Sequence, residues 1–550
     1  MIALLLLSCN EPTECMEGFV LDPATGACEL AAVEIEPETP SIYVPLDPPR
    51  LLRRMSLDLR GTLPTVEELD AVEADPQSLD AQALLDHQDF EDRLVILLGE
   101  RWHTLVDDVT IQAGSLRLGF DQEYAYERSV GEEPLRLMAR IAVEDRPWTE
   151  ILTADWTMGN DLLASIWPME LVEGDEDWRV AHYTDARPAV GVLATNGLWW
   201  RYGTNESNAN RGRAATLARL LACVDFHARP VSFEGITGDL DATSATDPAC
   251  TNCHSGLDPI ASALFGFWWF QRYNVDEISH YHAERELLGE QTLGTPPGWF
   301  GTPVQSLSGL AVEVAEDPRF SRCTAETFAE VLWRREATLH DLETVTTLDE
   351  RFQEGGLQLD ALLVATTETE AYRAGGLTDA ASDDDLDREA TRRLLVASQL
   401  ASVIEDLTGF EWTWEGYSML HNDSDGFRIL AADVDGTYVY QPGTEPTLTW
   451  TLVSERVAEA GAHHAVTTEL VEGGSRRLFG EITLDDRPGD SAFDAELSRL
   501  WWRLYAERPE DADIAALSAL WEAVDQDEDA AAAWIAVVTA LLRDPAFLTY

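Results

Sequence analysis

Apolar residues recur at helical spacing along most of the chain, and this pattern predicts a mainly α-helical protein. From Arg50 to Leu59 the apolar side chains of Leu51, Leu52 and Met55 fall on one side together with Leu59. Other stretches with the same character are residues 90–106, 134–143, 148–154, 214–222, 310–372, 391–407 and 491–550.

A helix start follows Gly61, which breaks the first of these stretches. Thr65 stands in the position of an N-cap, and Glu68 follows three residues later. A threonine and a glutamate at this spacing accept hydrogen bonds from each other's backbone N–H groups in a capping box. We therefore expect a second helix to begin after Thr65.

The pattern changes between Phe427 and Leu452. β-Branched and aromatic residues alternate there with turn residues, which favours a small β element. The residues that carry this prediction are Tyr438, Val439, Tyr440, Thr447, Thr449 and Trp450.

The charge of the chain is strongly negative, at −62, and all 38 basic residues are arginine. Such a surface repels phosphate backbones, so nucleic acid is a poor partner. We favour a GC-rich genome and an acidic solubilising surface as the explanation, with adaptation to salt as a contributor. Association with basic or cationic material is the alternative.

The first residues form a short apolar run that ends in Leu6-Leu7-Ser8-Cys9. This sequence resembles a bacterial lipobox, in which the cysteine is lipidated and becomes the mature N-terminus. A signal peptide normally has a basic region and at least about 15 residues, and both are missing here. Two explanations fit this short start: the start codon is assigned too late, or the apolar run at residues 1–7 arose by chance. The lipobox interpretation predicts a lipid anchor on Cys9 without a membrane-spanning helix.

Four further cysteines are candidates for disulfides. Cys15 and Cys28 flank a short loop and suggest a small disulfide-closed knot. Cys223 and Cys323 either form a long-range disulfide, which an oxidising compartment would allow, or are two buried thiols.

The remaining two cysteines lie in Cys250-Thr251-Asn252-Cys253-His254, the attachment pattern of c-type haem. Two thiols separated by two residues can form thioethers to the two vinyl groups on one porphyrin edge. The next residue, His254, then lies under the iron and supplies a neutral imidazole. We therefore expect one covalent haem c held by Cys250 and Cys253, with His254 as proximal iron ligand.

Two other uses of a Cys-x-x-Cys pair fit less well. A redox-active pair normally lies in a thioredoxin-like βαβ context, which the pattern around Cys250 does not show. Zinc needs four ligands, and no second Cys-x-x-Cys or paired histidines of standard spacing follow. With 100 acidic residues, carboxylate pairs carry little information, and no catalytic triad is indicated.

The distal iron ligand is left open by the sequence. His280 and His282 are the nearest candidates, and we expect only one of them to reach the iron. Candidates upstream are Met158, Met169 and His227. Each of these is alternatively an ordinary core or surface residue. The aromatic run 265–270 is equally a haem wall or plain core.

These features together predict a mainly α, multi-domain helical protein with a cytochrome c-like haem segment and a small β element near the C-terminal third. The long irregular stretch 228–250 delivers the chain to Cys250, as long loops inside domains often serve a site. The expected division is 1–8 (remnant of a signal peptide), 9–45 (lipobox cysteine and acidic linker with the small cysteine loop), 46–187 (helical domain), 188–374 (helical domain that bears the haem), 375–390 (linker) and 391–550 (C-terminal α domain with some β).

Several segments resemble the planctomycete-type cytochrome c proteins, a family also frequent in myxobacteria. The strongest match is residues 248–259, which end in Cys253-His254-Ser255-Gly256-Leu257-Asp258-Pro259. Other similar segments are 50–65, 146–155, 191–195, 211–213, 223–226, 317–323 and 543–549.

The resemblance covers most of residues 48–372 and, more loosely, 390–550. It implies a mainly helical, extracytoplasmic, haem-binding protein, but no particular reaction. Family members often have methionine where Leu257 stands, and leucine cannot ligate iron. The family's usual proline-rich run after the Cys223 region is reduced to Pro230.

Three functions follow from these observations. The first is an extracytoplasmic mono-haem cytochrome in the periplasm or at the cell surface, anchored as an outer-membrane lipoprotein through Cys9, that transfers electrons to a redox partner protein or senses redox state. The second is a haem enzyme of peroxidase or oxygenase type with an open distal site. The third is a surface scaffold or polymer-binding module whose haem is structural or lost.

Overall fold

The computed structural model describes residues 19–21, 28–30, 41–105, 118–226, 228, 248–268, 275–422, 427–436 and 438–550. Cys9, Cys15 and His227 lie outside these residues. The predicted lipidation at Cys9 and the predicted Cys15–Cys28 disulfide therefore stay predictions. Cys28 begins strand β2 (Cys28–Leu30), which pairs antiparallel with β1 (Phe19–Leu21).

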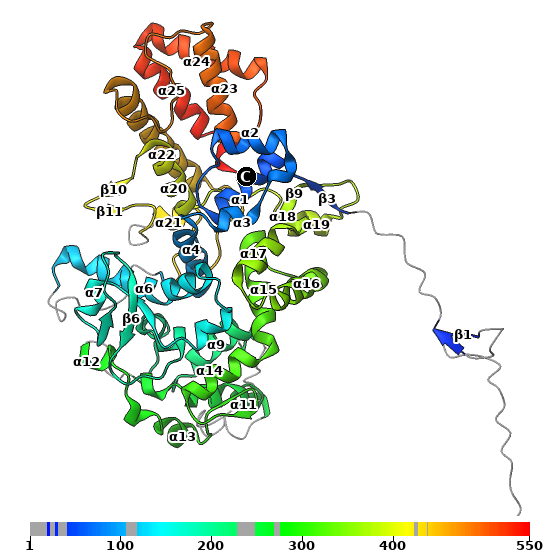
Figure 1. The fold of residues 1–550 in the computed structure, drawn as a ribbon, viewed down its shortest axis with the longest axis vertical. Coiled ribbons are helices and arrows are strands. Elements are labelled where there is room, and N and C mark those ends of the chain that lie inside the picture. Colours follow the sequence, from blue (N-terminus) through cyan, green and yellow to red (C-terminus); the bar gives the residue numbers. More distant parts are fainter. Residues whose placement is uncertain are drawn as a thin grey trace, which may run out of the picture.

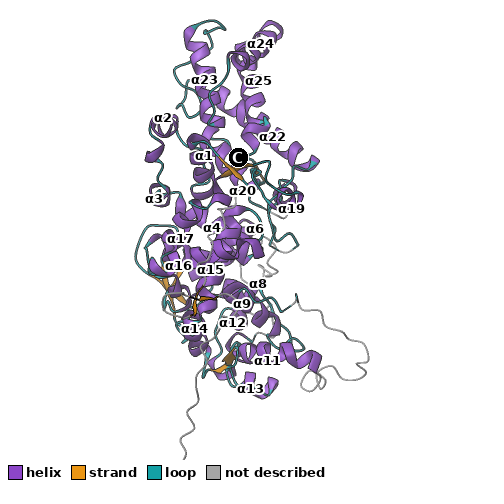
Figure 2. Cartoon of the chain, turned by 90° about the vertical axis from the view of Figure 1, so that its right-hand side faces the viewer, coloured by secondary structure: helices purple, strands orange, loops and turns teal. Residues whose placement is uncertain are grey.

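The fold is mainly helical, as the sequence predicts (Figures 1 and 2). Within the described part of the chain, no helix is both long and apolar enough to cross a bilayer. The helices of the first half are α1 (Pro48–Leu59), α2 (Val66–Ala74), α3 (Ala81–Leu85), α4 (Phe90–Trp102), α6 (Phe120–Val143), α7 (Asp161–Ala164), α8 (Asn196–Arg201), α9 (Arg211–Ala222), α11 (Pro248–Ser262) and α12 (Val275–Ile278), with the 3-10 helix η2 (Trp148–Leu152) between α6 and α7.

The second half continues with shorter connections between its helices. It contains α13 (Leu288–Leu293), α14 (Leu307–Glu316), α15 (Pro318–Trp333), α16 (Leu342–Glu354), α17 (Leu359–Thr367), α18 (Glu370–Arg373), α19 (Asp383–Arg388), α20 (Ala397–Thr408), α21 (Phe427–Leu430), α22 (Leu448–Ala465), α23 (Ser491–Tyr505), α24 (Asp511–Asp527), α25 (Ala530–Leu542) and α26 (Pro545–Leu548).

The first two predicted helices are confirmed. Helix α1 buries the predicted apolar face, and Met55 and Leu59 are at most 2% exposed. Helix α2 begins after Thr65 with the predicted capping box, because Thr65 Oγ1 accepts from the Glu68 N–H and Glu68 accepts from the Thr65 N–H.

Two hydrophobic cores meet at α1. The larger core contains buried side chains from residue 51 to residue 372, on both sides of the boundary expected at 187/188, together with Trp502 and Ala506. The second core contains residues 394–548 together with Leu57 and Leu63. Helix α1 therefore contributes Met55 to one core and Leu57 to the other, and in Figure 1 it lies between the C-terminal helices and the rest of the molecule.

Two adjacent arginines of α1 hold chain segments from the two cores. Arg53 donates to the backbone carbonyl oxygens of Leu504, Phe547 and Thr549 over 2.7–3.0 Å. Arg54 donates instead to the carbonyl oxygens of Tyr372, Ala374 and Thr391 over 2.6–2.8 Å. Both guanidinium groups are buried, and burial lowers the pKa of Arg53 to about 10 and that of Arg54 to about 9.

The strands form small antiparallel sheets of two or three strands. Strand β3 (Tyr43–Pro45) pairs with β9 (Ala374–Leu377), which joins the start of the helical region to its middle. The other sheets are β4 (Thr157–Gly159), β6 (Arg179–Tyr183) and β5 (Met169–Leu171) in that order, β7 (Gly298–Trp299) with β8 (Thr302–Pro303), and β10 (Thr413–Trp414) with β11 (Tyr417–Ser418).

The β element expected at 427–452 is wrong in its position. Residues 427–430 form α21, α22 begins at Leu448, and the strands of this region are β10 and β11, nearer the N-terminus. Thr447 caps α22 by accepting from the Trp450 N–H. The Asp435 carboxylate accepts from the N–H groups of Tyr438 and Val439, so side-chain bonds fold this segment as a turn.

The segment 375–390, expected to be a linker, is ordered. It contains most of β9 and all of α19, and its Glu389 forms an ion pair with Arg335 over 3.0 Å. Both of these side chains are at most 7% exposed. The connection between the two cores is therefore packed onto the larger one.

Candidate functional site

Helix α11 carries the whole cysteine–histidine motif at the end of the molecule opposite to α23–α25 (Figures 1 and 2). Cys250 and Cys253 are three residues apart on this helix, and His254 is four residues from Cys250, so all three lie on neighbouring positions of one face. Both cysteines are free thiols and partly exposed. The chain that enters α11, residues 229–247, lies outside the described residues.

An aromatic cluster packs beside Cys253. Phe226 and Phe300 stack with their ring centroids 6.1 Å apart and their planes 6° apart. Cys253 and Leu257 pack against this pair together with Ala215 and Ala218 of α9. A β-carbon on Gly256 would lie 3.3 Å from the Phe226 ring, so this ring lies directly against α11.

The imidazole of His254 is held by a carboxylate, which is in turn held by an arginine. His254 Nδ1 lies 3.1 Å from Asp258 Oδ1, one helical turn further along α11. Arg211 at the start of α9 donates to the same carboxylate through Nε over 2.7 Å and through Nη2 over 3.2 Å. Burial opposes ionisation of Asp258, but the bonds from His254 and Arg211 outweigh it and hold the pKa of Asp258 below its usual range.

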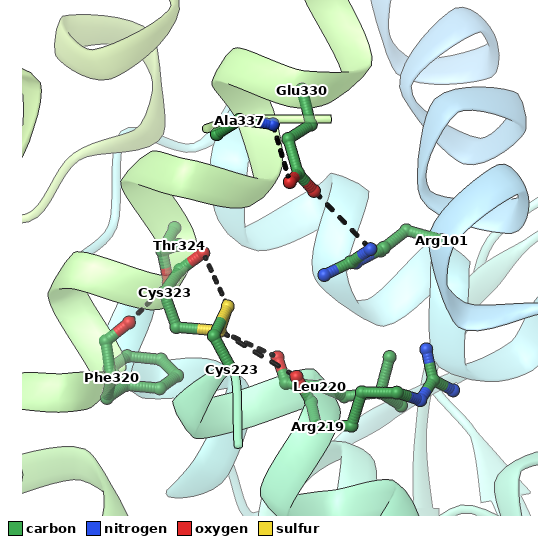
Figure 3. The surroundings of a disulfide bond; sticks show 9 residues. All are labelled: Arg101, Arg219, Leu220, Cys223, Phe320, Cys323, Thr324, Glu330 and Ala337. Carbon is green, nitrogen blue, oxygen red and sulfur yellow. Dashed lines mark hydrogen bonds and ion pairs between the residues drawn. A yellow bond between two sulfur atoms is a disulfide. The ribbon is translucent and has the colours of Figure 1, made fainter. Parts of the chain in front are cut away.

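A disulfide joins Cys223 to Cys323, with their Cα atoms 5.2 Å apart. The sequence had left this pair open between a bridge and two thiols. Cys223 follows the last residue of α9, and Cys323 lies within α15 (Figure 3). The Cys323 sulfur lies 3.8 Å from the carbonyl oxygens of Arg219 and Leu220. The bridge therefore fixes the end of α9, from which the chain continues to Phe226.

The same region contains a partly buried carboxylate of α15, that of Glu330. Figure 3 shows Glu330 of α15 between Arg101 of α4, 3.5 Å away, and the Ala337 N–H, which donates to it over 3.0 Å. Burial raises the pKa of Glu330 despite these partners. Helices α4, α9 and α15 are thus joined by polar as well as apolar contacts.

The candidate distal ligands are placed less favourably than His254. Both ring nitrogens of His282 lie within hydrogen-bond distance of acceptors, at 2.9 Å from the Glu277 carbonyl oxygen and 3.2 Å from the Glu284 carboxylate. The ring of His280 contacts the Ser279 hydroxyl over 3.0 Å. The His282 N–H donates to the Gly266 carbonyl, so this segment lies at the chain that follows the C-terminal end of α11.

The other candidates around the iron occupy core positions. Met158 and Met169 are buried in the sheet of β4, β6 and β5. Of the aromatic run 265–270, Phe265, Phe267 and Trp268 are at most 5% exposed and belong to the protein's cores. Residues 269 and 270 lie outside the described residues. The described part of the run is thus accounted for by packing.

The described residues fit a covalently bound haem. Two unoxidised thiols lie about one helical turn apart, and a carboxylate occupies Nδ1 of the following histidine. A carboxylate only accepts hydrogen bonds, so Nδ1 carries the proton and Nε2 keeps the lone pair that an iron ligand needs. In the described part of the chain, this motif included, no three His, Cys, Asp or Glu side chains are grouped so as to hold a metal ion by themselves.

The sequence analysis missed the partners of His254. Asp258 follows His254 by four residues on a helix, so its position could have been found from the spacing. Arg211 lies 47 residues away from Asp258, and only the packing of α9 on α11 brings the two together.

Comparisons with protein-family models, with curated proteins and with solved structures find no match to this chain.

Proposed function

We propose that the protein is an extracytoplasmic c-type cytochrome with one haem that transfers electrons or senses redox state. The arrangement on α11 supports this most directly, since two free thiols precede a histidine whose Nδ1 is occupied by Asp258. A bound haem would supply one-electron redox chemistry. Cys250 and Cys253 would hold it through thioethers, and His254 would ligate its iron through Nε2.

The surroundings of the motif suit a tethered cofactor. The stacked rings of Phe226 and Phe300 give an apolar surface beside Cys253. The disulfide at Cys223 fixes the end of α9 beside this cluster. Disulfides persist in oxidising compartments, which supports a location in the periplasm or at the cell surface. A lipid on Cys9 would anchor the protein to the outer membrane.

Covalent haem is the decisive measurement. The full chain is produced in the periplasm of a bacterium that attaches haem c, and the denatured protein is assayed for haem that stays on the polypeptide. We expect haem on the wild type and none on the C250A/C253A variant. A matched C15S/C28S variant removes two cysteines outside the motif and before the helical region, and it should keep its haem. A wild-type protein without covalent haem would overturn the proposal.

A haem enzyme with an open distal site is the second candidate. An open site is favoured because the candidate distal ligands have other contacts. The two ring nitrogens of His282 face acceptor oxygens, and Met158 and Met169 are buried in a sheet. Carbon monoxide binding to the reduced haem separates the two functions. Binding supports the enzyme, and a six-coordinate haem that does not bind it supports the electron carrier.

A further inference from the structure

We propose that Asp258 and Arg211 act together as positioning residues for His254, Asp258 by fixing the imidazole tautomer and Arg211 by limiting how strongly Asp258 polarises the ring. The tautomer part stands on the geometry of the chain alone. The tuning part rests on the proposed function, because it concerns a haem iron on Nε2.

The Asp258 carboxylate is bonded more closely by Arg211 than by His254. Oδ1 contacts both His254 Nδ1, over 3.1 Å, and Arg211 Nε, over 2.7 Å, while Oδ2 contacts Arg211 Nη2 over 3.2 Å. The closer and charged donor is the arginine. The carboxylate is therefore largely neutralised by Arg211, and the imidazole receives the weaker bond.

The three side chains are partly buried, so water screens their hydrogen bonds less than at a fully exposed surface. The side chains of His254, Asp258 and Arg211 are 27%, 14% and 21% exposed. Arg211 starts α9 and Asp258 lies in α11, so the pair also fixes how these helices meet. The disulfide at the other end of α9 holds the helix at its C-terminus, and Arg211 is therefore fixed on a helix tied at both ends.

The direction of each effect follows from electrostatics. A carboxylate that accepts from Nδ1 makes the imidazole a stronger donor and favours the oxidised, more positive iron. Removing the Asp258 charge should raise the midpoint potential. Removing the Arg211 charge should unmask the carboxylate, strengthen its bond to His254 and lower the potential. A purely structural role of the pair would not produce shifts of opposite sign.

The first test measures midpoint potentials of the haem-loaded full chain. We expect D258N to raise the potential and R211Q to lower it. A tenfold change in the equilibrium constant of reduction would appear as a shift of about 59 mV for one electron. R211K keeps the charge and should restore most of the wild-type value. Shifts of the same sign in D258N and R211Q would overturn the tuning role.

A matched control separates this pair from general charge effects. Arg319 lies over the Phe300 ring at 4.0 Å and bonds Asp317, so it is a carboxylate-paired cation beside the aromatic cluster that packs on Cys253. R319Q should leave the potential near that of the wild type. A shift as large as that of R211Q would mean that only the net charge matters and would overturn the tuning role assigned to Arg211.

The second test needs no haem. Imidazole nitrogen NMR of the full chain without cofactor, at alkaline pH, reports which ring nitrogen of His254 carries the proton. We expect Nδ1–H in the wild type and a mixture of tautomers in D258A. A wild type with Nε2–H would overturn the assignment to Asp258. If the wild type never acquires haem, the proposed function fails, while this measurement still decides the role of Asp258.

Discussion

Arg393 donates a hydrogen bond to Asp58 over 2.7 Å, and both side chains are only 1% exposed. The Asp58 carboxylate also accepts from the hydroxyl groups of Tyr372, over 3.0 Å, and Tyr550, over 2.6 Å. Asp58 comes from α1 and Arg393 from the start of the C-terminal region. The two cores thus meet around one buried carboxylate whose partners come from three distant parts of the chain.

Asp58→Ala should cost about 3–5 kcal/mol of unfolding free energy, because it leaves the Arg393 guanidinium buried without its counter-charge. Denaturant unfolding followed by tryptophan fluorescence measures this. Glu459→Ala is the matched control, since Glu459 pairs with Arg456 at the surface, where both side chains are more than half exposed. Loss of an exposed pair costs less than about 1 kcal/mol. Equal effects of the two substitutions would contradict the prediction.

Glu133 should make stability depend on pH. Burial raises the pKa of Glu133 to about 7 from an ordinary 4.5, although Tyr183, Thr157 and the Gly197 N–H donate to it. The folded state therefore holds a proton that the unfolded state has lost. Its stabilisation is complete below pH 4.5 and is lost as the pH rises through about 7, a change of about 3 kcal/mol.

Urea unfolding of the wild type and of Glu133→Gln across this pH range tests the prediction, because only the wild type should show the decrease. The neighbouring Glu132→Gln serves as control with the opposite sign. Burial opposes ionisation of Glu132, but Arg128 and Arg136 lower its pKa. Its contribution is therefore present above the ordinary value and is lost as the pH falls. Parallel curves for the wild type and Glu133→Gln would refute the assignment.

Removing the Cys223–Cys323 disulfide should destabilise the larger core. The bridge closes a loop of 100 residues, for which chain entropy gives about 4–5 kcal/mol. The C223S/C323S variant should therefore unfold at lower denaturant concentration. C250A/C253A in the haem-free protein is the control, because those two cysteines form no bond with each other. An unchanged midpoint for C223S/C323S would show that packing alone fixes the end of α9.

Gly191→Ala should destabilise the protein much more than Gly356→Ala. Both glycines have positive φ, +53° and +71°. A β-carbon at Gly191 would lie 2.0 Å from the Ile151 carbonyl oxygen, while one at Gly356 would meet nothing within 4 Å. Left-handed strain alone costs about 1–2 kcal/mol, and the clash adds about 1–3 kcal/mol. Thermal unfolding of the two variants measures the difference, and similar midpoints would contradict it.

Local sequence signals predicted the elements whose structure is set locally. The capping box at Thr65 and Glu68 is one example, because both of its partners lie within one helical turn. The apolar face of α1 is another, because its helical spacing is visible in the sequence although the residues that it packs against are distant. The β prediction at 427–452 failed because residues of high strand propensity are held there by side-chain bonds from Asp435 and Thr447. Propensity is a weak guide where such bonds compete with it.

The candidate site was predictable only where its residues are neighbours in the sequence. The cysteine spacing and the histidine are a contiguous motif, whereas Arg211 reaches Asp258 through helix packing. Arg53 and Arg54 appear in the sequence as polar positions on an amphipathic helix, yet both are buried. Their hydrogen bonds go to backbone carbonyl groups, which leave no trace in the side-chain pattern.

Because α1 lies between two cores, its two sides are covered at different times during synthesis of the chain. Arg53 bonds the Phe547 carbonyl, which is synthesised 494 residues later. At about 5–20 residues per second, that interval lasts roughly 25–100 s. During it, the side of α1 that bears Leu57 has no partner, because almost all of the second core is still to be made. One of the first helices of the fold is therefore among the last to have its apolar surface fully covered.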